Sequence, residues 1–197
     1  NSVAIVAYDV LRQNDFENEK DYIEIISEAI ENPIGTSKLD ELFSKGEKIV
    51  IITSDITRPM PSYKVLPILV EKLESIGVER KDLKIVFALG SHRKQTEDEK
   101  IKLVGKEIYD TIECVDSDMY DCVNVGTTKN GTPVDITRCV ADCDKIIALG
   151  NIEYHYFAGY SGGAKAIMPG ISSRDAIQAN HSRMTDPRAF ASNIDDN

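Results

Sequence analysis

The sequence contains no tryptophan, only three histidines and four cysteines among its 197 residues. No apolar stretch approaches the roughly 18 residues that a membrane-spanning helix needs, so we do not expect the chain to insert into a membrane. Basic residues are also scarce, because 23 Lys and Arg face 33 Asp and Glu and leave a net charge of −10. No Lys/Arg cluster offsets this acidic background, so nucleic acid is not an expected partner.

The few cysteines contain no C-x-x-C pair. A chain of this length buries enough apolar surface to fold without disulfides, so reduced thiols and a cytoplasmic location are predicted. The first residues lack the basic region that opens a secretory signal peptide, which favours the same location. A metal site on Cys139 and Cys143, four residues apart on one helical face, is the weaker alternative because no histidine follows at zinc-finger spacing.

Three short runs are continuously apolar: residues 48–53, 84–89 and 145–149. A strand with one face in solvent alternates apolar and polar residues, whereas continuous apolar runs are typical of parallel strands covered on both faces. The sequence therefore predicts an α/β fold. We expect a Rossmann-like open, mostly parallel sheet with helices on both faces, in one compact unit spanning residues 1–197.

Amphipathic segments that fit helices lie between these runs. Leu66, Leu69 and Leu73 recur at helical spacing, and Thr96 with Glu99 has the form of a capping box. Glycines follow two of the segments and favour helix ends there. The predicted helices are 37–45, 63–76, one that opens at 96 and stops at Gly105, and one that opens at 172–175.

One segment departs from this alternation of strands and helices. Residues 123–137 predict a projecting β-hairpin, because two β-prone runs flank Asn130-Gly131, a dipeptide typical of a two-residue type I′ turn. The polar residues 12–21 predict a connecting segment.

Distinctive polar residues follow each predicted strand. Asp55 and Arg58 follow the first, His92 the second and His155 the third. In an open parallel sheet, ligands bind outside the carboxyl ends of the strands, where the loops diverge. We therefore expect these four side chains to share one rim of the sheet.

Residues 156–170 are rich in glycine and contain a single lysine, Lys165. They match neither the phosphate loop G-x-x-x-x-G-K-[ST] nor the dinucleotide motif G-x-G-x-x-G. Small residues before a helix still leave backbone N–H groups free to face an anion, so binding of a mononucleotide phosphate stays an open alternative. Residues 159–163 match G-x-S-x-G and make Ser161 a candidate hydrolase nucleophile, although Pro169 shortens the helix that such a serine needs. If Lys165 lies near a helix N-terminus, the positive end of the helix dipole favours its neutral, nucleophilic amine form. The alternative is an ordinary surface lysine.

These motifs together resemble a known family. From roughly Ile23 to the last residue, the chain is similar to the N-terminal domain of nickel-dependent lactate racemase and its 2-hydroxyacid racemase relatives. The resemblance rests on four motifs in order: SDITRP at 54–59, GSHR at 90–93, HYFAGYSGGAKAIMPG at 155–170 and Asn180-His181.

In that family the cofactor is a nickel pincer nucleotide, a pyridinium mononucleotide with two sulfur arms and a carbon bonded to nickel. The resemblance implies that Lys165 forms the covalent tether and that His181 completes the nickel coordination, a role that imidazole nitrogen suits. It also implies cofactor contacts from Gly162, Gly163 and Asp55.

The implied activity is a racemase that inverts C2 of a 2-hydroxyacid by hydride transfer to and from the pyridinium ring, with lactate as the default substrate. His92 and His155 resemble the paired acid/base residues, one for each enantiomer. An imidazole pKa of about 6.5 suits proton exchange near neutral pH. Arg58, near Asp55, resembles the part of the pocket that binds substrate carboxylate or cofactor phosphate.

The resemblance further implies that residues 1–197 form the N-terminal cofactor-binding domain of a larger two-domain protein. The C-terminal domain and the proteins that synthesise the cofactor are then expected partners, and the isolated segment should be inactive. Two alternatives stay open. One is a mononucleotide- or metal-binding module without turnover, which needs the tether and the metal ligand but not two bases. The other is a hydrolase that uses Ser161 or a three-histidine zinc site.

Overall fold

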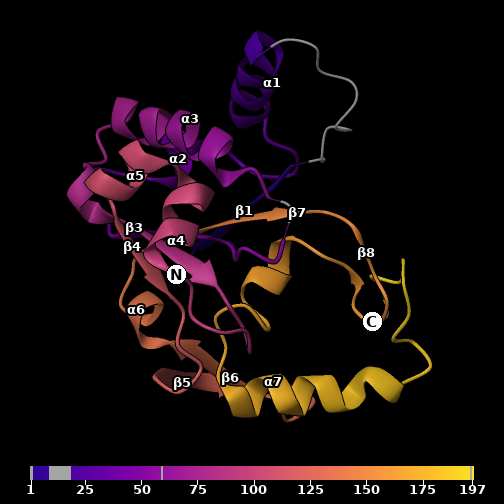
Figure 1. The fold of residues 1–197 in the computed structure, drawn as a ribbon. Coiled ribbons are helices and arrows are strands. Elements are labelled where there is room, and N and C mark those ends of the chain that lie inside the picture. Colours follow the sequence, from indigo (N-terminus) through magenta and orange to yellow (C-terminus); the bar gives the residue numbers. More distant parts are fainter. Residues whose placement is uncertain (1, 9–18, 59, 196) are drawn as a thin grey trace.

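A five-stranded parallel sheet forms the centre of the molecule (Figure 1). The computed structural model describes residues 2–8, 19–58, 60–195 and 197. The strand order is β1-β7-β2-β3-β4 with every pair parallel, which confirms the predicted open sheet. Its strands are β1 (Ser2–Tyr8), β2 (Ile49–Ser54), β3 (Leu83–Ala88), β4 (Glu113–Asp116) and β7 (Lys145–Asn151).

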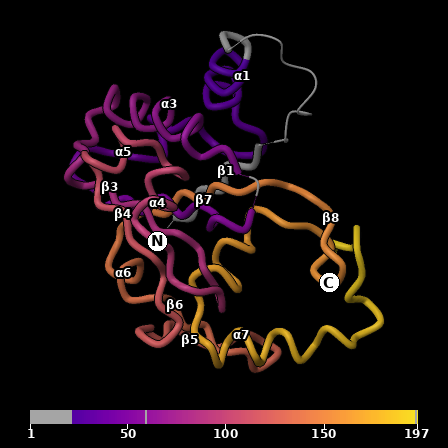
Figure 2. The backbone as a smooth tube through the Cα atoms, in the orientation of Figure 1, coloured from indigo at the N-terminus to yellow at the C-terminus, as the bar shows by residue number. Residues whose placement is uncertain are grey.

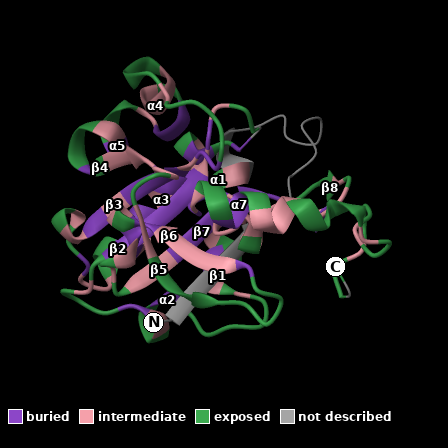
Figure 3. Ribbon diagram, turned by 90° about the horizontal axis from the view of Figure 1, so that it is seen from below, coloured by how far each residue is buried: buried purple, intermediate pink, exposed green. Residues whose placement is uncertain are grey.

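Side chains of β2 alternate between two cores. Ile49 and Ile51 belong to the larger core on one face of the sheet, and Val50 and Ile52 to the smaller core on the other. All four are at most 3% exposed. Figure 3 shows the same burial along the neighbouring strands. The continuous apolar run thus has its predicted cause, a strand covered on both faces.

Helices cover the larger core. The buried faces of α1, α3, α4 and α5 all pack in it, and Leu66, Leu69 and Leu73 of α3 are at most 1% exposed. Pro67 lies in the second turn of α3, and the helix continues past it. These helices are α1 (Glu19–Glu31), α2 (Leu39–Leu42), α3 (Ser62–Ser75), α4 (Glu97–Val104) and α5 (Lys106–Thr111), and the short 3-10 helix η1 (Arg80–Asp82) precedes β3.

Shorter elements cover the other face of the sheet. Val140 and Ile171 pack against Val50 and Ile52 in the smaller core. Figure 2 traces the chain from β7 out to β8, back beside the sheet and then into α7. The elements on this route are β8 (Tyr154–His155), β9 (Gly159–Tyr160), the 3-10 helix η2 (Gly163–Ala166) and α7 (Arg174–His181); α6 (Arg138–Ala141) precedes β7, and the 3-10 helix η3 (Ser182–Thr185) follows α7.

The predicted capping box is confirmed. The Glu99 N–H donates to Thr96 Oγ1 at 3.2 Å, and the Thr96 N–H donates to Glu99 Oε2 at 2.9 Å. This pair satisfies two backbone donors at the start of α4, which ends before Gly105 as predicted. The predicted start of the last helix is confirmed as well, because Ser173 Oγ accepts the Ala176 N–H at 3.1 Å.

The helix predicted over 37–45 is wrong in length. Only Leu39–Leu42 is helical, because Phe43 is extended (φ −124°, ψ 147°) and only 3% exposed. An extended backbone brings the Phe43 ring into the larger core, and this burial outweighs the helical preference of residues 44 and 45.

The predicted hairpin is present, but its turn differs from the prediction. β5 (Cys122–Thr127) pairs antiparallel with β6 (Pro133–Thr137). Among the described residues of this turn only Gly131 has a positive φ, +82°, whereas a type I′ turn requires two such residues. The Gly131 N–H donates to the Thr128 carbonyl, so Lys129 and Asn130 are the central residues of the turn and Gly131 follows it. Asn130 therefore avoids the strained left-handed region.

Several elements were not predicted: β1, the edge strand β4 and the short β8–β9 pair. Of the predicted connecting segment 12–21, residues 12–18 lie outside the described part of the chain, and Glu19 begins α1. Within the described residues, every helix is too short or too polar to cross a bilayer.

Candidate active site

A cavity of about 540 Å³ opens at the carboxyl ends of β2, β3 and β7. β3 lies on one side of β2 and β7 on the other, so the loops that follow these strands diverge and leave a hollow between them. The cavity brings together residues from all three loops and from the glycine-rich stretch. Its lining includes Asp55, Arg58, His92, His155, Gly162, Lys165 and His181. Gly163 is next to this lining and does not belong to it.

Asp55 and His92 form a hydrogen-bonded pair on this rim. Asp55 Oδ2 lies 2.5 Å from His92 Nδ1, and the Asp55 side chain is only 3% exposed. Thr57 donates to the other carboxylate oxygen, Oδ1, from its hydroxyl at 2.6 Å and its backbone N–H at 3.1 Å. The buried carboxylate is thereby fixed, and it orients the His92 ring with Nε2 away from Asp55. Sequence patterns placed both residues on one rim but did not reveal this contact.

His155 is held by a backbone donor and two aromatic rings. The Ala158 N–H donates to His155 Nδ1 at 3.2 Å. Tyr156 stacks on the imidazole with the centroids 4.8 Å apart, and Phe157 meets it edge-on at 4.6 Å. Burial lowers the pKa of His155, and the nearby cations Lys165 and Arg58 lower it further. The neutral ring is therefore favoured.

Lys165 is a half-buried amine within the cavity. Its Nζ lies 5.9 Å from the centroid of the Phe157 ring. Burial, and after it the charge of Arg58, lowers the pKa of Lys165 to about 8. The expected helix dipole does not account for this pKa, because the segment 163–166 is a four-residue 3-10 helix with little dipole. The nucleophilic amine expected there has a different cause, which is desolvation.

Phe157 connects the site residues and was missed by the sequence analysis. Its ring contacts His155, approaches Lys165 Nζ and meets the His181 ring edge-on with the centroids 5.3 Å apart. His181 is the last residue of α7, so Phe157 bridges the loop after β7 and that helix. The aromatic pair Tyr156-Phe157 before the glycines was the feature of the sequence that could have indicated this role.

Comparisons with known proteins show the family of the chain. The family model described as the lactate racemase N-terminal domain matches residues 4–192. The chain belongs to this family. It is 37% identical over 184 residues to a lactate racemase from Lactiplantibacillus plantarum. The aligned residues are 91% of this chain and 43% of that protein. A lactate racemase from Thermoanaerobacterium thermosaccharolyticum is 39% identical over 161 residues, which are 80% of this chain and 38% of that protein.

Solved structures show the same relationship for the fold. The lactate racemase apoprotein from T. thermosaccharolyticum superimposes with a TM-score of 0.78 at 38% identity, covering 86% of this chain and 42% of that chain. A Thermotoga maritima protein at 21% identity has a TM-score of 0.69, covering 91% of this chain and 44% of that chain, and shows the fold alone. The chain thus spans less than half the length of the curated lactate racemases that it matches.

Ser161 is not placed as a nucleophile. Its hydroxyl donates to the Asn151 carbonyl at 2.7 Å and accepts the Glu153 N–H at 2.9 Å. A catalytic serine instead donates its proton to a neighbouring base. Ser161 connects the two sides of the loop that carries His155, so the geometry does not support the serine hydrolase alternative.

Gly162 has a structural reason to be glycine. Its φ is +81°, and a Cβ there would lie 3.1 Å from the Asn151 carbonyl oxygen. The absence of a side chain lets the segment with Lys165 pass close to β7.

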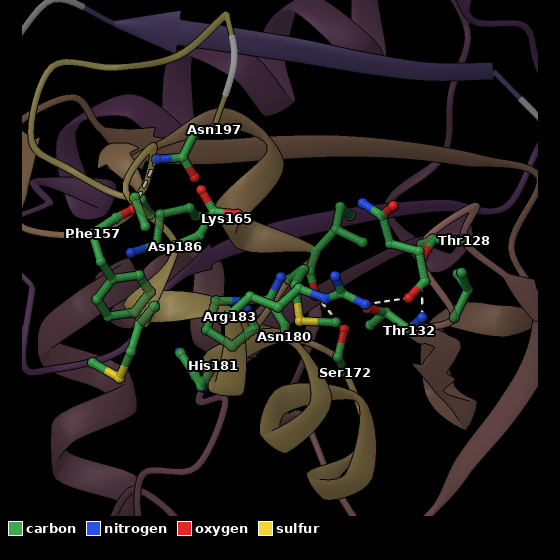
Figure 4. Close-up of a pocket in the computed structure, with 18 of the residues that line it drawn as sticks. Thr128, Thr132, Phe157, Lys165, Ser172, Asn180, His181, Arg183, Asp186 and Asn197 are labelled. Atoms are coloured by element: carbon green, nitrogen blue, oxygen red, sulfur yellow. Dashed lines mark hydrogen bonds between the residues drawn. The ribbon is translucent and has the colours of Figure 1, made fainter.

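A second cavity of about 460 Å³ adjoins the first. Figure 4 shows Phe157, Lys165 and His181 at one end of it and Thr128 and Thr132 of the hairpin turn at the other. Because Lys165 and His181 line both cavities, a group attached to Lys165 has space on either side.

The described residues contain no cluster of three or more His, Cys, Asp and Glu side chains that could hold a metal. The three histidines therefore do not form the zinc site of the hydrolase alternative. The four cysteines are unpaired and partly buried, and Cys139 and Cys143 do not belong to a metal cluster of the described chain.

Proposed function

We propose that the chain is the cofactor-binding part of a racemase that inverts C2 of a 2-hydroxyacid, with lactate as the default substrate and a lysine-tethered nickel pincer nucleotide as cofactor. The observation that supports this most is the common cavity, which gathers an amine of lowered pKa, two imidazoles and a third imidazole at its edge. Membership of the lactate racemase family supports the reaction class.

The residues present fit such a cofactor. Lys165 is buried enough to be a nucleophile near neutral pH, as a covalent tether requires. A cavity of about 540 Å³ lies within the range of small-molecule sites. The described protein offers no metal cluster of its own, so a metal here needs ligands that the cofactor brings, with His181 as the protein ligand.

When bound, the nucleotide supplies a hydride acceptor and donor for the substrate α-carbon. The protein residues handle the proton and the orientation. His92 Nε2 takes the proton of the substrate hydroxyl while Asp55 holds Nδ1. Arg58 lines the same cavity, and its planar guanidinium suits two hydrogen bonds to the substrate carboxylate. His155 lines the cavity as the second imidazole and serves the opposite enantiomer.

We also propose that a C-terminal domain completes the site. The chain covers 43% and 38% of the two lactate racemases it matches, so most of their length has no counterpart here. Orientation of the substrate and exclusion of water from the cavity would depend on that domain. The proteins that synthesise the cofactor would be further partners, and we place the protein in the cytoplasm with its thiols reduced.

Mass spectrometry and metal analysis of the full-length protein test this proposal. Coexpressed with the cofactor-synthesis proteins, it should gain mass on the peptide with Lys165 and contain about one nickel per chain. Lys165→Arg should abolish the added mass, and His181→Ala should retain it but lose most nickel. An unmodified peptide in a preparation whose control racemase is loaded would contradict the proposal.

A panel of single-enantiomer 2-hydroxyacids then separates the racemase from a binding module without turnover. A racemase interconverts at least one pair, and His92→Asn should slow it by about 10²- to 10⁴-fold. Cofactor and nickel without any interconversion would favour the binding module.

A further inference from the structure

The two cavity histidines have opposite neighbours at the same ring atom. His92 Nδ1 faces the Asp55 carboxylate, whereas His155 Nδ1 faces the Ala158 N–H. We propose that His92 and His155 hold opposite neutral tautomers, so that the resting protein is ready for only one of the two enantiomers, the one whose hydroxyl faces His92. The inference deepens the proposed racemase and rests on it for its consequence in turnover.

The Asp55 contact assigns the proton on His92. Asp55 Oδ1 already accepts two hydrogen bonds from Thr57, and Oδ2 lies 2.5 Å from His92 Nδ1. A carboxylate only accepts, so Nδ1 carries the hydrogen. The neutral ring then has its lone pair on Nε2, at the atom directed away from Asp55. In its neutral form His92 can therefore take a proton without any movement of the ring.

The Ala158 contact assigns the opposite tautomer to His155. A backbone N–H can only donate, so His155 Nδ1 must be unprotonated while the 3.2 Å contact holds. The neutral ring then carries its hydrogen on Nε2. The titratable and charged groups around this ring are Lys165, Arg58, Glu153 and His181. Burial lowers the pKa of His155, and the cations Lys165 and Arg58 lower it further, which favours the neutral ring.

Proton balance makes the two histidines unequal. In the proposed reaction the cofactor would supply the hydride acceptor, and oxidation of the substrate to the keto acid would release its hydroxyl proton. That proton would move to His92 Nε2, and the resulting imidazolium would still donate Nδ1–H to Asp55. His155 Nε2 already holds a hydrogen and can only donate a hydrogen bond to the substrate oxygen. For His155 to accept a proton at Nε2, the ring must first leave Ala158 and carry its hydrogen on Nδ1.

Nuclear magnetic resonance of the protein with ¹⁵N-labelled histidine tests the assignment without any cofactor. Only three imidazoles contribute signals, and His92→Gln, His155→Gln and His181→Gln each remove one set. The pattern of two-bond ¹H–¹⁵N correlations distinguishes the tautomers. We expect hydrogen on Nδ1 of His92 and on Nε2 of neutral His155. The same neutral tautomer in both rings would overturn the proposal.

Asp55→Asn makes the test sharper. Thr57 donates at the position of Oδ1, so the amide oxygen should occupy it and the amide nitrogen should face His92. An amide nitrogen donates, so the hydrogen on His92 should move to Nε2 while His155 stays unchanged. Asp116→Asn is the matched control, because Asp116 is also a buried carboxylate but accepts hydrogen bonds from Gln95. No change in His92 on Asp55→Asn would contradict the assignment.

Rapid mixing of loaded full-length protein with single enantiomers tests the consequence for turnover. Keto acid should form faster from one enantiomer than from the other in the first turnover, and Asp55→Asn should slow the faster direction more. Equal first-turnover rates would refute the readiness for one enantiomer. The magnetic resonance experiment needs no cofactor, so its result does not depend on the proposed function. If no adduct formed at Lys165, the proposed function would be overturned, but the tautomer assignment would still stand or fall by the resonance data.

Discussion

The reactivity of Lys165 comes from its surroundings and not from its own chemistry. Burial is the main cause of its lowered pKa, and the charge of Arg58 comes second. A lysine of ordinary pKa near 10.5 would be almost fully protonated at neutral pH, whereas a pKa of about 8 leaves a useful fraction of neutral amine. The site thus prepares a nucleophile before any cofactor arrives.

We predict that acylation of Lys165 by an excess of anhydride rises with pH through a midpoint at about 8, as measured by peptide mass spectrometry. The charged amine is unreactive, so labelling is slow below this pH and fast above it. Arg58→Met should move the midpoint upward, because one cation that opposes the ammonium is gone. Arg93→Met is the control, since Arg93 pairs with Glu99 on the surface. A midpoint near 10.5 in the wild type would refute the buried-amine account.

The same lowered pKa has a consequence for stability. Between about pH 8 and 10.5 the unfolded chain holds the Lys165 proton more tightly than the folded protein does. The contribution of this group to the free energy of unfolding therefore rises with pH through that window and is smallest below it.

At the scale of single residues, the sequence predicted which residues line a common cavity better than how they contact one another. Asp55 and His92 are 37 positions apart, and their contact depends on the exact spacing of two loops at the sheet edge. The donor to His155 is a backbone N–H, which every residue except proline has, so no sequence pattern marks Ala158.

At the scale of elements, a buried serine, Ser117, connects two of the loops that carry the site residues. It lies outside every motif found in the sequence. Ser117 Oγ accepts the Leu89 N–H at 3.0 Å and donates to the Gly170 carbonyl at 3.0 Å. Leu89 begins the loop with His92, and Gly170 ends the stretch with Lys165. Ser117 is 5% exposed, so water cannot readily replace it.

Ser117→Ala should lower the free energy of unfolding by about 1–3 kcal/mol, because two buried hydrogen bonds of about 0.5–1.5 kcal/mol each are lost. The Leu89 N–H keeps the Phe87 carbonyl as a partner, and the Gly170 carbonyl keeps the Gly90 N–H. It should also broaden or shift the His92 resonances, which a purely global loss of stability would not do under native conditions. Chemical denaturation and the histidine spectra measure both effects. Ser75→Ala is the control, since exposed Ser75 only donates to the Lys72 carbonyl. Unchanged His92 signals would mean that Ser117 does not position this loop.

Elements with a continuous apolar pattern were predictable, and those whose form depends on tertiary contacts were not. β2, β3 and β7 lie where the apolar runs are. β4 is an edge strand that begins with Glu113 and ends with Asp116, so its pattern resembles a loop. The hairpin was predictable from Asn130-Gly131, but the choice of which residue takes the positive φ was not.

For the whole molecule, the site lies at the end of the sheet near β8, where large side chains remain in solvent. Tyr154 is 73% exposed and Tyr156 is 71% exposed, and both line the 540 Å³ cavity. In Figure 1 this region lies beside the C-terminal end of the chain and away from β5. Exposed aromatic side chains around a cavity are typical of surfaces that another domain covers.

We therefore predict that Tyr154 and Tyr156 are protected from nitration in the full-length protein and modified in the present chain. Tyr120 is the internal control, because it is 71% exposed and precedes β5 on a different part of the surface, so its modification should be equal in both. Peptide mass spectrometry after mild nitration gives the three ratios. Protection confined to Tyr154 and Tyr156 would show that the proposed C-terminal domain closes over this cavity. Equal modification of all three tyrosines would place that domain elsewhere and leave the cavity open on this side.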